Sequence, residues 1–188
     1  GISLASLTHE GKIALLTLLA QLKQRGMTLI VDSNYRPRLW DSIPHAQEWF
    51  EKLYRISDIA LVTGDDEQIL WQKPALTEQD ITQRLHQWGN QNVIVKLGVN
   101  GAYWSDGKST GYVSPKPIDS VIDTTAAGDS FNAAFIAAWL QNQSLSTCCL
   151  WGNTLAGLVI QHHGAIIPHE ITDSFYTLIK DNHDTVNC

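Results

Sequence analysis

A nine-residue turn carries the strongest chemical signal in the chain: residues 123–131 read D-T-T-A-A-G-D-S-F. The turn follows the short apolar run Val121-Ile122, which predicts a strand, and it opens a segment rich in small residues, which predicts a helix. A tight turn between a strand and a helix points unpaired backbone N–H groups, and the positive end of the helix dipole, at an anion. Asp123 and Asp129 flank the turn, and an acid beside a phosphate site is costly unless it binds a metal or accepts a proton. The combination predicts phosphoryl transfer.

A second candidate site lies in residues 32–40, D-S-N-Y-R-P-R-L-W, which follow an apolar run. Loops at the carboxyl ends of strands are where α/β sheets bind ligands. Arg36 suits a carboxylate ligand there, because its planar guanidinium can donate two parallel hydrogen bonds. Asn34 is expected to add a second contact. The alternative is that Arg36 and Arg38 are solvated loop charges.

Two further strand ends carry polar or glycine-rich loops. The acidic run that ends in Glu67 could hold Mg²⁺ through water, or it could cap the helix that follows. The later run V-K-L-G-V-N-G contains a G-x-x-G pattern, which by itself is a common turn. In a nucleotide site, Lys96 could reach a phosphate, while Gly98 and Gly101 would let the backbone approach the nucleotide.

Apolar strands alternate with amphipathic helices through the first half of the chain. This order predicts right-handed crossovers and a three-layer α/β/α sandwich with a mostly parallel sheet. The first strand is continuously apolar, as in strands that are buried on both faces. The predicted strands cover residues 27–31, 58–62 and 92–97. The first predicted helix has Thr8 as its N-cap and ends at Gly26. The next two cover 46–56 and 78–89, and Thr77 is the N-cap of the last one.

The rest of the chain departs from this alternation. Residues 101–105 and 110–113 are expected to form an antiparallel hairpin, and later helices are expected near 146–162 and over 172–180, with a loop over 164–168 and a frayed tail over 181–188. The opening Gly1-Ile2-Ser3-Leu4 is typical of the end of a strand. We therefore interpret residues 1–188 as the carboxyl-terminal part of a single domain whose first strands are missing.

Composition narrows the function classes. The net charge of −6 leaves no basic surface for nucleic acid, and no apolar run approaches the roughly 18 residues that a membrane-spanning helix needs. The cysteines are odd in number and lack the spacing of a disulfide framework, which favours a reducing cytoplasm. They are Cys148, Cys149 and Cys188. The adjacent pair is expected to be buried in a helix rather than to act as a redox pair. Adjacent histidines near a helix end are not expected to bind zinc.

The D-T-x-A-A-G-D turn resembles a signature of the ribokinase (PfkB) family of carbohydrate kinases. In that family the final aspartate is the general base that accepts the proton of the sugar hydroxyl. The resemblance implies that Asp129 is the base, and that the backbone of Ala126, Ala127 and Gly128 binds the transferring phosphoryl group.

Other matches to the same family imply ion and nucleotide contacts. Asp123 and the carbonyl of Thr125 match a site for a monovalent cation such as K⁺. Glu67 matches the glutamate of an N-x-x-E pattern that acts through Mg²⁺-bound water, but Gly64 stands where asparagine is expected, so the role of the asparagine does not carry over. Asn153 matches a position near adenine.

The D-x-N-x-R-P-x-L-W loop resembles the substrate loop of 2-keto-3-deoxygluconate kinases, in which the arginine contacts the carboxylate of the sugar acid. Arg36 occupies that position. The V-K-L-G-V-N-G run resembles the nucleotide-edge loop of the family, which implies ATP near Lys96, Gly98 and Gly101. Together these matches imply ATP- and Mg²⁺-dependent phosphorylation of the terminal hydroxyl of 2-keto-3-deoxy-D-gluconate.

The resemblance covers only the carboxyl-terminal three-fifths of the family pattern, without the Gly-Gly signature and the β-sheet lid. It implies a cytoplasmic enzyme whose full-length relatives are homo-oligomers, without nucleic acid or membrane as partner. Two alternatives stay open. The protein could be a fructokinase or another sugar kinase of the family, or an inactive remnant that binds only nucleotide or a partner.

Overall fold

The computed structural model describes residues 1–118, 120–173 and 175–176. These residues group into two compact units. The first unit holds residues 1–98 and 103–111, and the second holds 99–102 together with the described residues from 112 onward.

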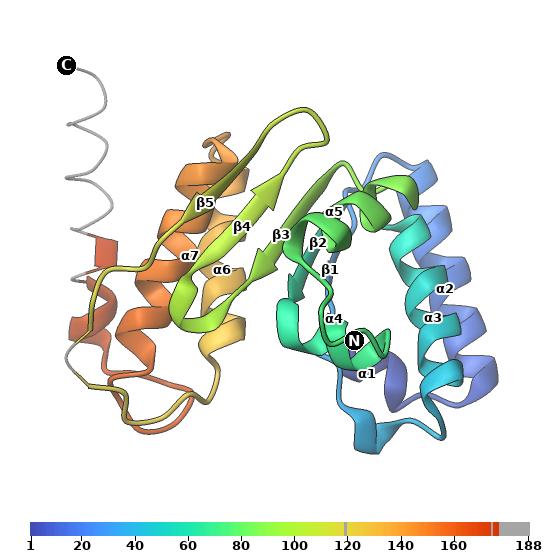
Figure 1. The fold of residues 1–188 in the computed structure, drawn as a ribbon, viewed down its shortest axis with the longest axis horizontal. Coiled ribbons are helices and arrows are strands. Elements are labelled where there is room, and N and C mark those ends of the chain that lie inside the picture. Colours follow the sequence, from blue (N-terminus) through green and yellow to red (C-terminus); the bar gives the residue numbers. More distant parts are fainter. Residues whose placement is uncertain (119, 174, 177–188) are drawn as a thin grey trace. The chain divides into compact units, whose positions relative to one another are not determined.

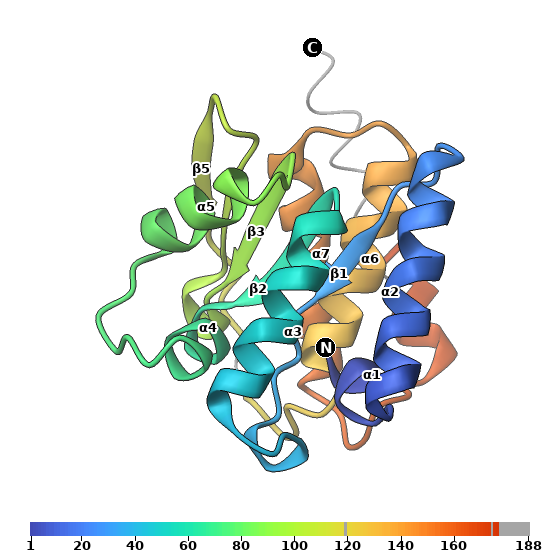
Figure 2. The same ribbon diagram turned by 90° about the vertical axis from the view of Figure 1, so that its right-hand side faces the viewer.

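Three parallel strands form the centre of the first unit, and helices connect one to the next (Figures 1 and 2). The strands pair in chain order, with Ile30 opposite Ile59 and Ile59 opposite Asn92. The sheet order is β1-β2-β3-β4-β5, so the predicted mostly parallel α/β fold is confirmed. The elements are β1 (Ile30–Asp32), α3 (Ile43–Ile56), β2 (Ile59–Thr63), α4 (Gly64–Leu70), α5 (Glu78–Gln87), β3 (Asn92–Lys96), β4 (Ala102–Ser105) and β5 (Thr110–Val113), with short 3₁₀ turns at Pro37–Leu39 and Gly98–Asn100.

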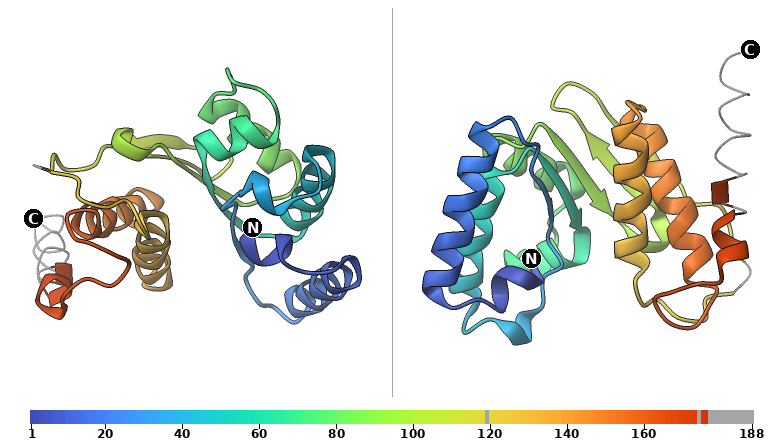
Figure 3. Two further views of the ribbon diagram at one scale, coloured as in Figure 1. Left: turned by 90° about the horizontal axis from the view of Figure 1, so that it is seen from below. Right: turned by 180° about the vertical axis from the view of Figure 1, so that it is seen from behind.

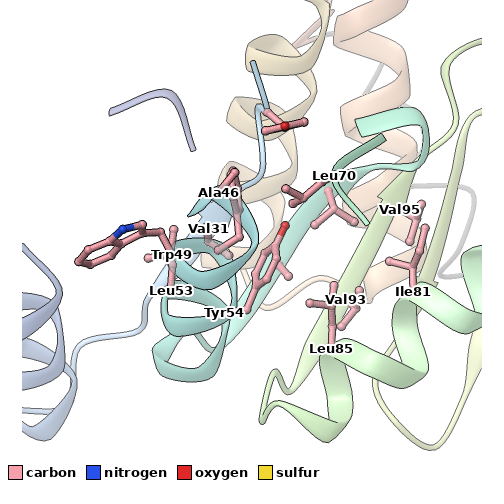
Figure 4. Close-up of a cluster of buried hydrophobic side chains, with 14 of the residues drawn as sticks. Val31, Ala46, Trp49, Leu53, Tyr54, Leu70, Ile81, Leu85, Val93 and Val95 are labelled. Carbon is pink, nitrogen blue, oxygen red and sulfur yellow. The ribbon is translucent and has the colours of Figure 1, made fainter. Parts of the chain in front are cut away.

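Alternating side chains of the three strands build the core against α3 and α5 (Figure 4). Successive residues of a strand point to opposite faces of the sheet. Ile59, Leu61 and Ile94 therefore point away from this core, yet they are buried as well. The central strands are thus covered on both faces, as the continuous apolar runs predict. The core positions are Val31, Ala60, Val62, Val93 and Val95 on the strands, Trp49, Phe50, Leu53 and Tyr54 on α3, and Ile81 and Leu85 on α5.

The start of the chain differs from the prediction. Residues 1–4 do not end a strand, because α1 (Ile2–Ala5) is a short helix in which the amides of Leu4 and Ala5 donate to the carbonyl of Gly1. α2 (His9–Gln24) follows, and Figure 3 shows both helices beside the N-terminus. The first strand is also shorter than predicted. The amide of Met27 donates to the carbonyl of Leu22, 3.2 Å away, and so closes the end of α2 instead of joining the sheet.

Side-chain caps start three helices of the first unit, α2, α3 and α5. The hydroxyl of Thr8 accepts the amide of Gly11 at 3.1 Å, and Thr77 forms a reciprocal capping box with Asp80. Both predicted N-caps are therefore confirmed. α3 begins three residues earlier than predicted, because Ser42 caps it and a proline in the first turn already has the backbone angle of a helix.

Two helices, α6 (Ala127–Leu140) and α7 (Leu145–Val159), dominate the second unit and pack side by side (Figure 3). They approach so closely that a Cβ atom on Gly152 would lie 2.7 Å from the ring of Phe131. Cys148 and Cys149 are buried in α7, as predicted, and burial raises the pKa of the Cys148 thiol to about 11.

The segment before α6 is not the predicted strand. Val121 and Ile122 are about half exposed, and the amide of Ile122 donates to the carbonyl of Ile160. Residues 169–173 are helical, so the last helix starts earlier than predicted, whereas 177–180 and the predicted frayed tail lie outside the described residues. Within the described part of the chain, no helix is long and apolar enough to cross a membrane.

Candidate functional site

The A-A-G-D turn of the second unit forms the amino-terminal end of α6. Ala126 adopts a left-handed conformation, with φ of 60°, and α6 begins at the next residue. The amide of Ala127 donates to the carbonyl of Thr124 at 3.2 Å, so one of the three predicted anion-binding residues already uses its N–H. Gly128 and Asp129 are exposed at the second and third helical positions. An N–H at these positions has no carbonyl partner within the helix, so it is available to an anion.

Asp123 fixes this turn from its entrance. One carboxylate oxygen accepts the amide of Thr125 and the other accepts the amide of Gly164, each at 2.8 Å. The Thr125 side chain and these two amides lower the pKa of Asp123 to about 2. Asp123 therefore connects the turn to the loop after α7. Its role with Thr125 in binding a monovalent cation stays a prediction.

Two residues predicted to bind nucleotide also have packing roles at β5. The side-chain amide of Asn153 is nearly buried and donates to the carbonyl of Val113 at 2.8 Å. Gly101 has a φ of +85°, and a Cβ atom there would lie only 2.1 Å from the same carbonyl oxygen. Gly101 is therefore required by the fold, whether or not a nucleotide approaches it.

In the first unit, the carboxyl ends of β1 and β3 bring one predicted nucleotide contact against the start of the predicted substrate loop. Lys96 at the end of β3 pairs with Asp32 at the end of β1, with 3.0 Å between the nitrogen and the carboxylate oxygen. Lys96 therefore has a carboxylate neighbour at the edge where it was predicted to reach a phosphate. Gly98 follows it with a φ of +57° and open space around the position of a Cβ atom, so a ligand could approach the backbone there.

The loop after β1 has an ordered backbone. The amide of Tyr35 donates to Asp66 at 3.1 Å, and the exposed Arg36 donates to the carbonyl of Tyr35 at 2.9 Å. Asn34 has a φ of +35°, and among the described residues its buried Oδ1 atom has no hydrogen-bond partner. An unsatisfied buried acceptor is costly, so a donor that reached this atom would gain a hydrogen bond.

Glu67 lies in the interior. Its carboxylate is fully buried and accepts the hydroxyl of Tyr54 at 2.6 Å, the indole N–H of Trp71 at 2.9 Å and the guanidinium of Arg84. Burial raises the pKa of Glu67, and Arg84 opposes that effect. The expected action of Glu67 on Mg²⁺ through water stays a prediction that this arrangement does not support. No group of three or more His, Cys, Asp or Glu side chains within the described ranges could hold a metal ion.

The acidic run instead starts α4, which was the alternative interpretation. Asp65, Asp66 and Glu67 lie in its first turn, where the helix dipole favours negative charge. Sequence reasoning did not identify Arg84 as the partner of Glu67, or Asp66 as the partner of Tyr35. Neither pair follows a helical or strand period, so no local pattern could have revealed them.

The motifs in both units belong to one family of proteins. The sequence profile described as "pfkB family carbohydrate kinase" matches residues 2–172, so this chain belongs to that family. Among curated relatives it is 50% identical over 169 residues to the 2-dehydro-3-deoxygluconokinase of Haemophilus influenzae, covering 89% of this chain and 53% of the relative. It is 40% identical over 174 residues to the enzyme of the same name from Escherichia coli K12, covering 90% and 55%. The chain thus spans about half the length of these relatives.

Solved structures show the same fold at lower sequence identity. A fructokinase from Vibrio cholerae O395, crystallised with fructose, ADP and calcium, matches with a TM-score of 0.80 and 22% identity, over 94% of this chain and 58% of that one. An aminoimidazole riboside kinase from Salmonella enterica matches with a TM-score of 0.73 and 21% identity, over 87% and 57%. These matches confirm the ribokinase-like fold.

Proposed function

We propose that the protein is an ATP-dependent kinase that phosphorylates the terminal hydroxyl of 2-keto-3-deoxygluconate, the sugar acid also called 2-dehydro-3-deoxygluconate. The observation that carries this proposal is the 50% identity to a relative named for that activity, over 89% of this chain. Because the chain spans about half of that relative, the activity of the whole protein is inferred from the part that matches.

The loop after β1 supports a sugar acid as substrate. Arg36 is exposed, and its guanidinium can offer paired N–H donors to a carboxylate. In this proposal Arg36 binds the carboxylate of the substrate, and the unpaired Oδ1 atom of Asn34 accepts a hydrogen bond from a substrate hydroxyl. A neutral sugar has no carboxylate for Arg36 to bind.

The turn at the start of α6 supports phosphoryl transfer. Asp129 removes the proton from the attacking hydroxyl, whose oxygen forms a bond to the γ-phosphorus of ATP while the bond to ADP breaks. The N–H of Gly128 stabilises the charge on the transferring group. Kinases of this family require a divalent ion. Mg²⁺ bound to the nucleotide would neutralise phosphate charge here. Of the two glycines predicted to border the nucleotide, Gly98 leaves open space where a Cβ atom would lie, and Gly101 does not.

A substrate comparison tests the proposal. The purified protein, at the full length encoded by its gene, is supplied with ATP and Mg²⁺ and with 2-keto-3-deoxygluconate, fructose or ribose in turn. We expect the highest kcat/KM with the sugar acid. Preference for fructose would indicate a fructokinase, and ATP binding without any turnover would indicate the inactive remnant. The proposal also includes a cytoplasmic location and self-association. Fractionation of cells tests the location, and sedimentation of the purified protein tests the self-association.

Two variants separate the proposed roles. Arg36→Ala should raise the KM for the sugar acid about tenfold or more with little change in kcat, because a charge-assisted hydrogen bond to the substrate is lost. Arg38→Ala, a change of the neighbouring exposed arginine, is the matched control. Asp129→Asn should lower kcat by roughly 10²-fold or more while ATP binding is kept. An unchanged KM in the first variant, or lost ATP binding in the last, would contradict the assigned roles.

A further inference from the structure

Asp66 connects α4 to the loop that carries Arg36. Its Oδ2 atom accepts the amide of Tyr35 at 3.1 Å, although the two residues are 31 positions apart in the chain. The ring of Tyr35 is itself buried and packs edge-on against Phe50, with 5.8 Å between the ring centroids. Tyr35 is therefore held at both its side chain and its backbone.

The guanidinium of Arg36 depends on that backbone. Its Nη1 atom donates to the carbonyl of Tyr35 at 2.9 Å, so the charged group folds back against the residue that Asp66 holds. A displacement of Tyr35 would move both the carbonyl and the guanidinium attached to it. Such a displacement would weaken the hydrogen bonds between the guanidinium and a substrate carboxylate.

Asp66 lies in a helical turn that buried contacts hold in place. The next residue, Glu67, is fully buried and bonded to Tyr54, Trp71 and Arg84, which fixes the first turn of α4 against α3 and α5. Burial raises the pKa of Asp66, while the Tyr35 amide and the charge of Arg36 lower it. Part of the cost of burying this carboxylate is thus offset by its contacts with the loop.

We propose that Asp66 is a positioning residue that fixes the Tyr35 backbone, so that Arg36 presents its guanidinium to the carboxylate of the substrate. This inference rests on the proposed function, because it takes Arg36 as the carboxylate-binding residue. The competing explanation is that Asp66 only favours the start of α4, as any acidic residue in a first turn does.

Three variants of the full-length protein distinguish these explanations. Asp66→Ala removes the acceptor, Asp66→Asn keeps an oxygen that can accept the Tyr35 amide, and Asp65→Ala removes the exposed neighbouring acid of the same turn as a control. We expect the KM for the sugar acid to rise about tenfold in Asp66→Ala, as for a lost hydrogen bond to a charged group. It should rise less than about threefold in the other two variants, with kcat held in all three.

A double variant tests whether Asp66 acts through Arg36. In the Arg36→Ala background, Asp66→Ala should raise the KM no further, because residues that act on one contact are not additive. A purely structural role would raise the KM by the same factor in both backgrounds, and that result would overturn the inference.

Amide hydrogen exchange supplies a readout that needs no substrate. The Tyr35 amide should exchange at least about tenfold faster in Asp66→Ala, and near the wild-type rate in Asp66→Asn. Unchanged exchange in Asp66→Ala overturns the inference, whatever the substrate is. Faster exchange in a protein that does not phosphorylate the sugar acid would support the positioning contact and refute the proposed function, so the two failures are distinguishable.

Discussion

Replacing Arg84 by methionine should strongly destabilise the first unit, because it leaves the buried carboxylate of Glu67 without its cation. Removing one partner of a buried ion pair typically costs about 3–5 kcal/mol. Two features reduce the loss here. The Nε atom of Arg84 is buried without a partner among the described residues, which already costs on the order of 1 kcal/mol. Methionine also keeps an apolar contact with the rings of Trp71 and Trp88, above which the guanidinium lies at 4.7 and 5.4 Å. We therefore expect a loss of about 3 kcal/mol at neutral pH.

The sign of the pH dependence follows from the pKa of Glu67. Burial already raises this pKa, and the positive charge of Arg84 is the largest of the effects that lower it, so the variant should raise it further. Below the unfolded value near 4.5 the carboxyl is protonated in both states, and little charge has to be buried. The loss should grow as the pH rises through the folded pKa and level off above it.

Urea unfolding followed by tryptophan fluorescence measures this loss, and unchanged m-values would show that the same unit unfolds. Arg55→Met is the matched control, since Arg55 lies 5.7 Å from the ring of Trp88 but pairs with Glu51 in an exposed salt bridge. It should cost less than about 1 kcal/mol. The double variant Glu67→Gln/Arg84→Met should be more stable than Arg84→Met alone, because no buried charge remains. Equal losses in the two arginine variants, or a double variant less stable than the single one, would refute the reasoning.

Three shorter predictions concern the second unit. Gly152→Ala should lower the free energy of unfolding by about 1–3 kcal/mol, because its Cβ would overlap the ring of Phe131. Thermal unfolding measures this loss, and an unchanged Tm would show that α6 and α7 can separate freely. Ala126→Gly should stabilise the second unit by about 1 kcal/mol, since glycine adopts the left-handed conformation without strain. A lower free energy of unfolding in denaturant would disprove this. The pKa of Asp123 is depressed, so its bond to Gly164 should be kept above about pH 4 and lost as the pH falls through about 2. Exchange of the Gly164 amide, compared at each pH with that in Asp123→Ala, which lacks the titrating carboxylate, measures this. Protection relative to that variant that is unchanged down to pH 2 would contradict the prediction.

Local signals predicted most of the fold. Thr8 and Thr77 were recognisable as N-caps because a capping hydroxyl bonds an amide only three residues away. The three wrong strand predictions concern short apolar runs at 1–4, 27–29 and 121–122. Such runs fit a strand or an irregular segment equally well, and only contacts with distant residues, such as the bond from Ile122 to Ile160, decide between them.

The candidate site was predictable in its residue types but not in its partners. The motifs that contain Asp123, Arg36 and Asp129 are recognisable in the sequence. The contacts that hold such residues in place join positions 17, 41 and 64 apart: Glu67 with Arg84, Asp123 with Gly164, and Asp32 with Lys96. These separations follow from how the strands and loops pack in space, and no periodicity in the sequence encodes them.

The order of the strands also bears on how the first unit assembles. β2 pairs with β1 and β3 pairs with β2, and the paired residues are in each case about 30 positions apart. Closing a loop of this length costs roughly 3 kcal/mol, nearly the same at each step. A chain emerging from the ribosome could therefore add each strand to the one made just before it, without waiting for distant segments. Vectorial synthesis suits this arrangement, because β2 and β3 each emerge after the strand with which they pair has been made.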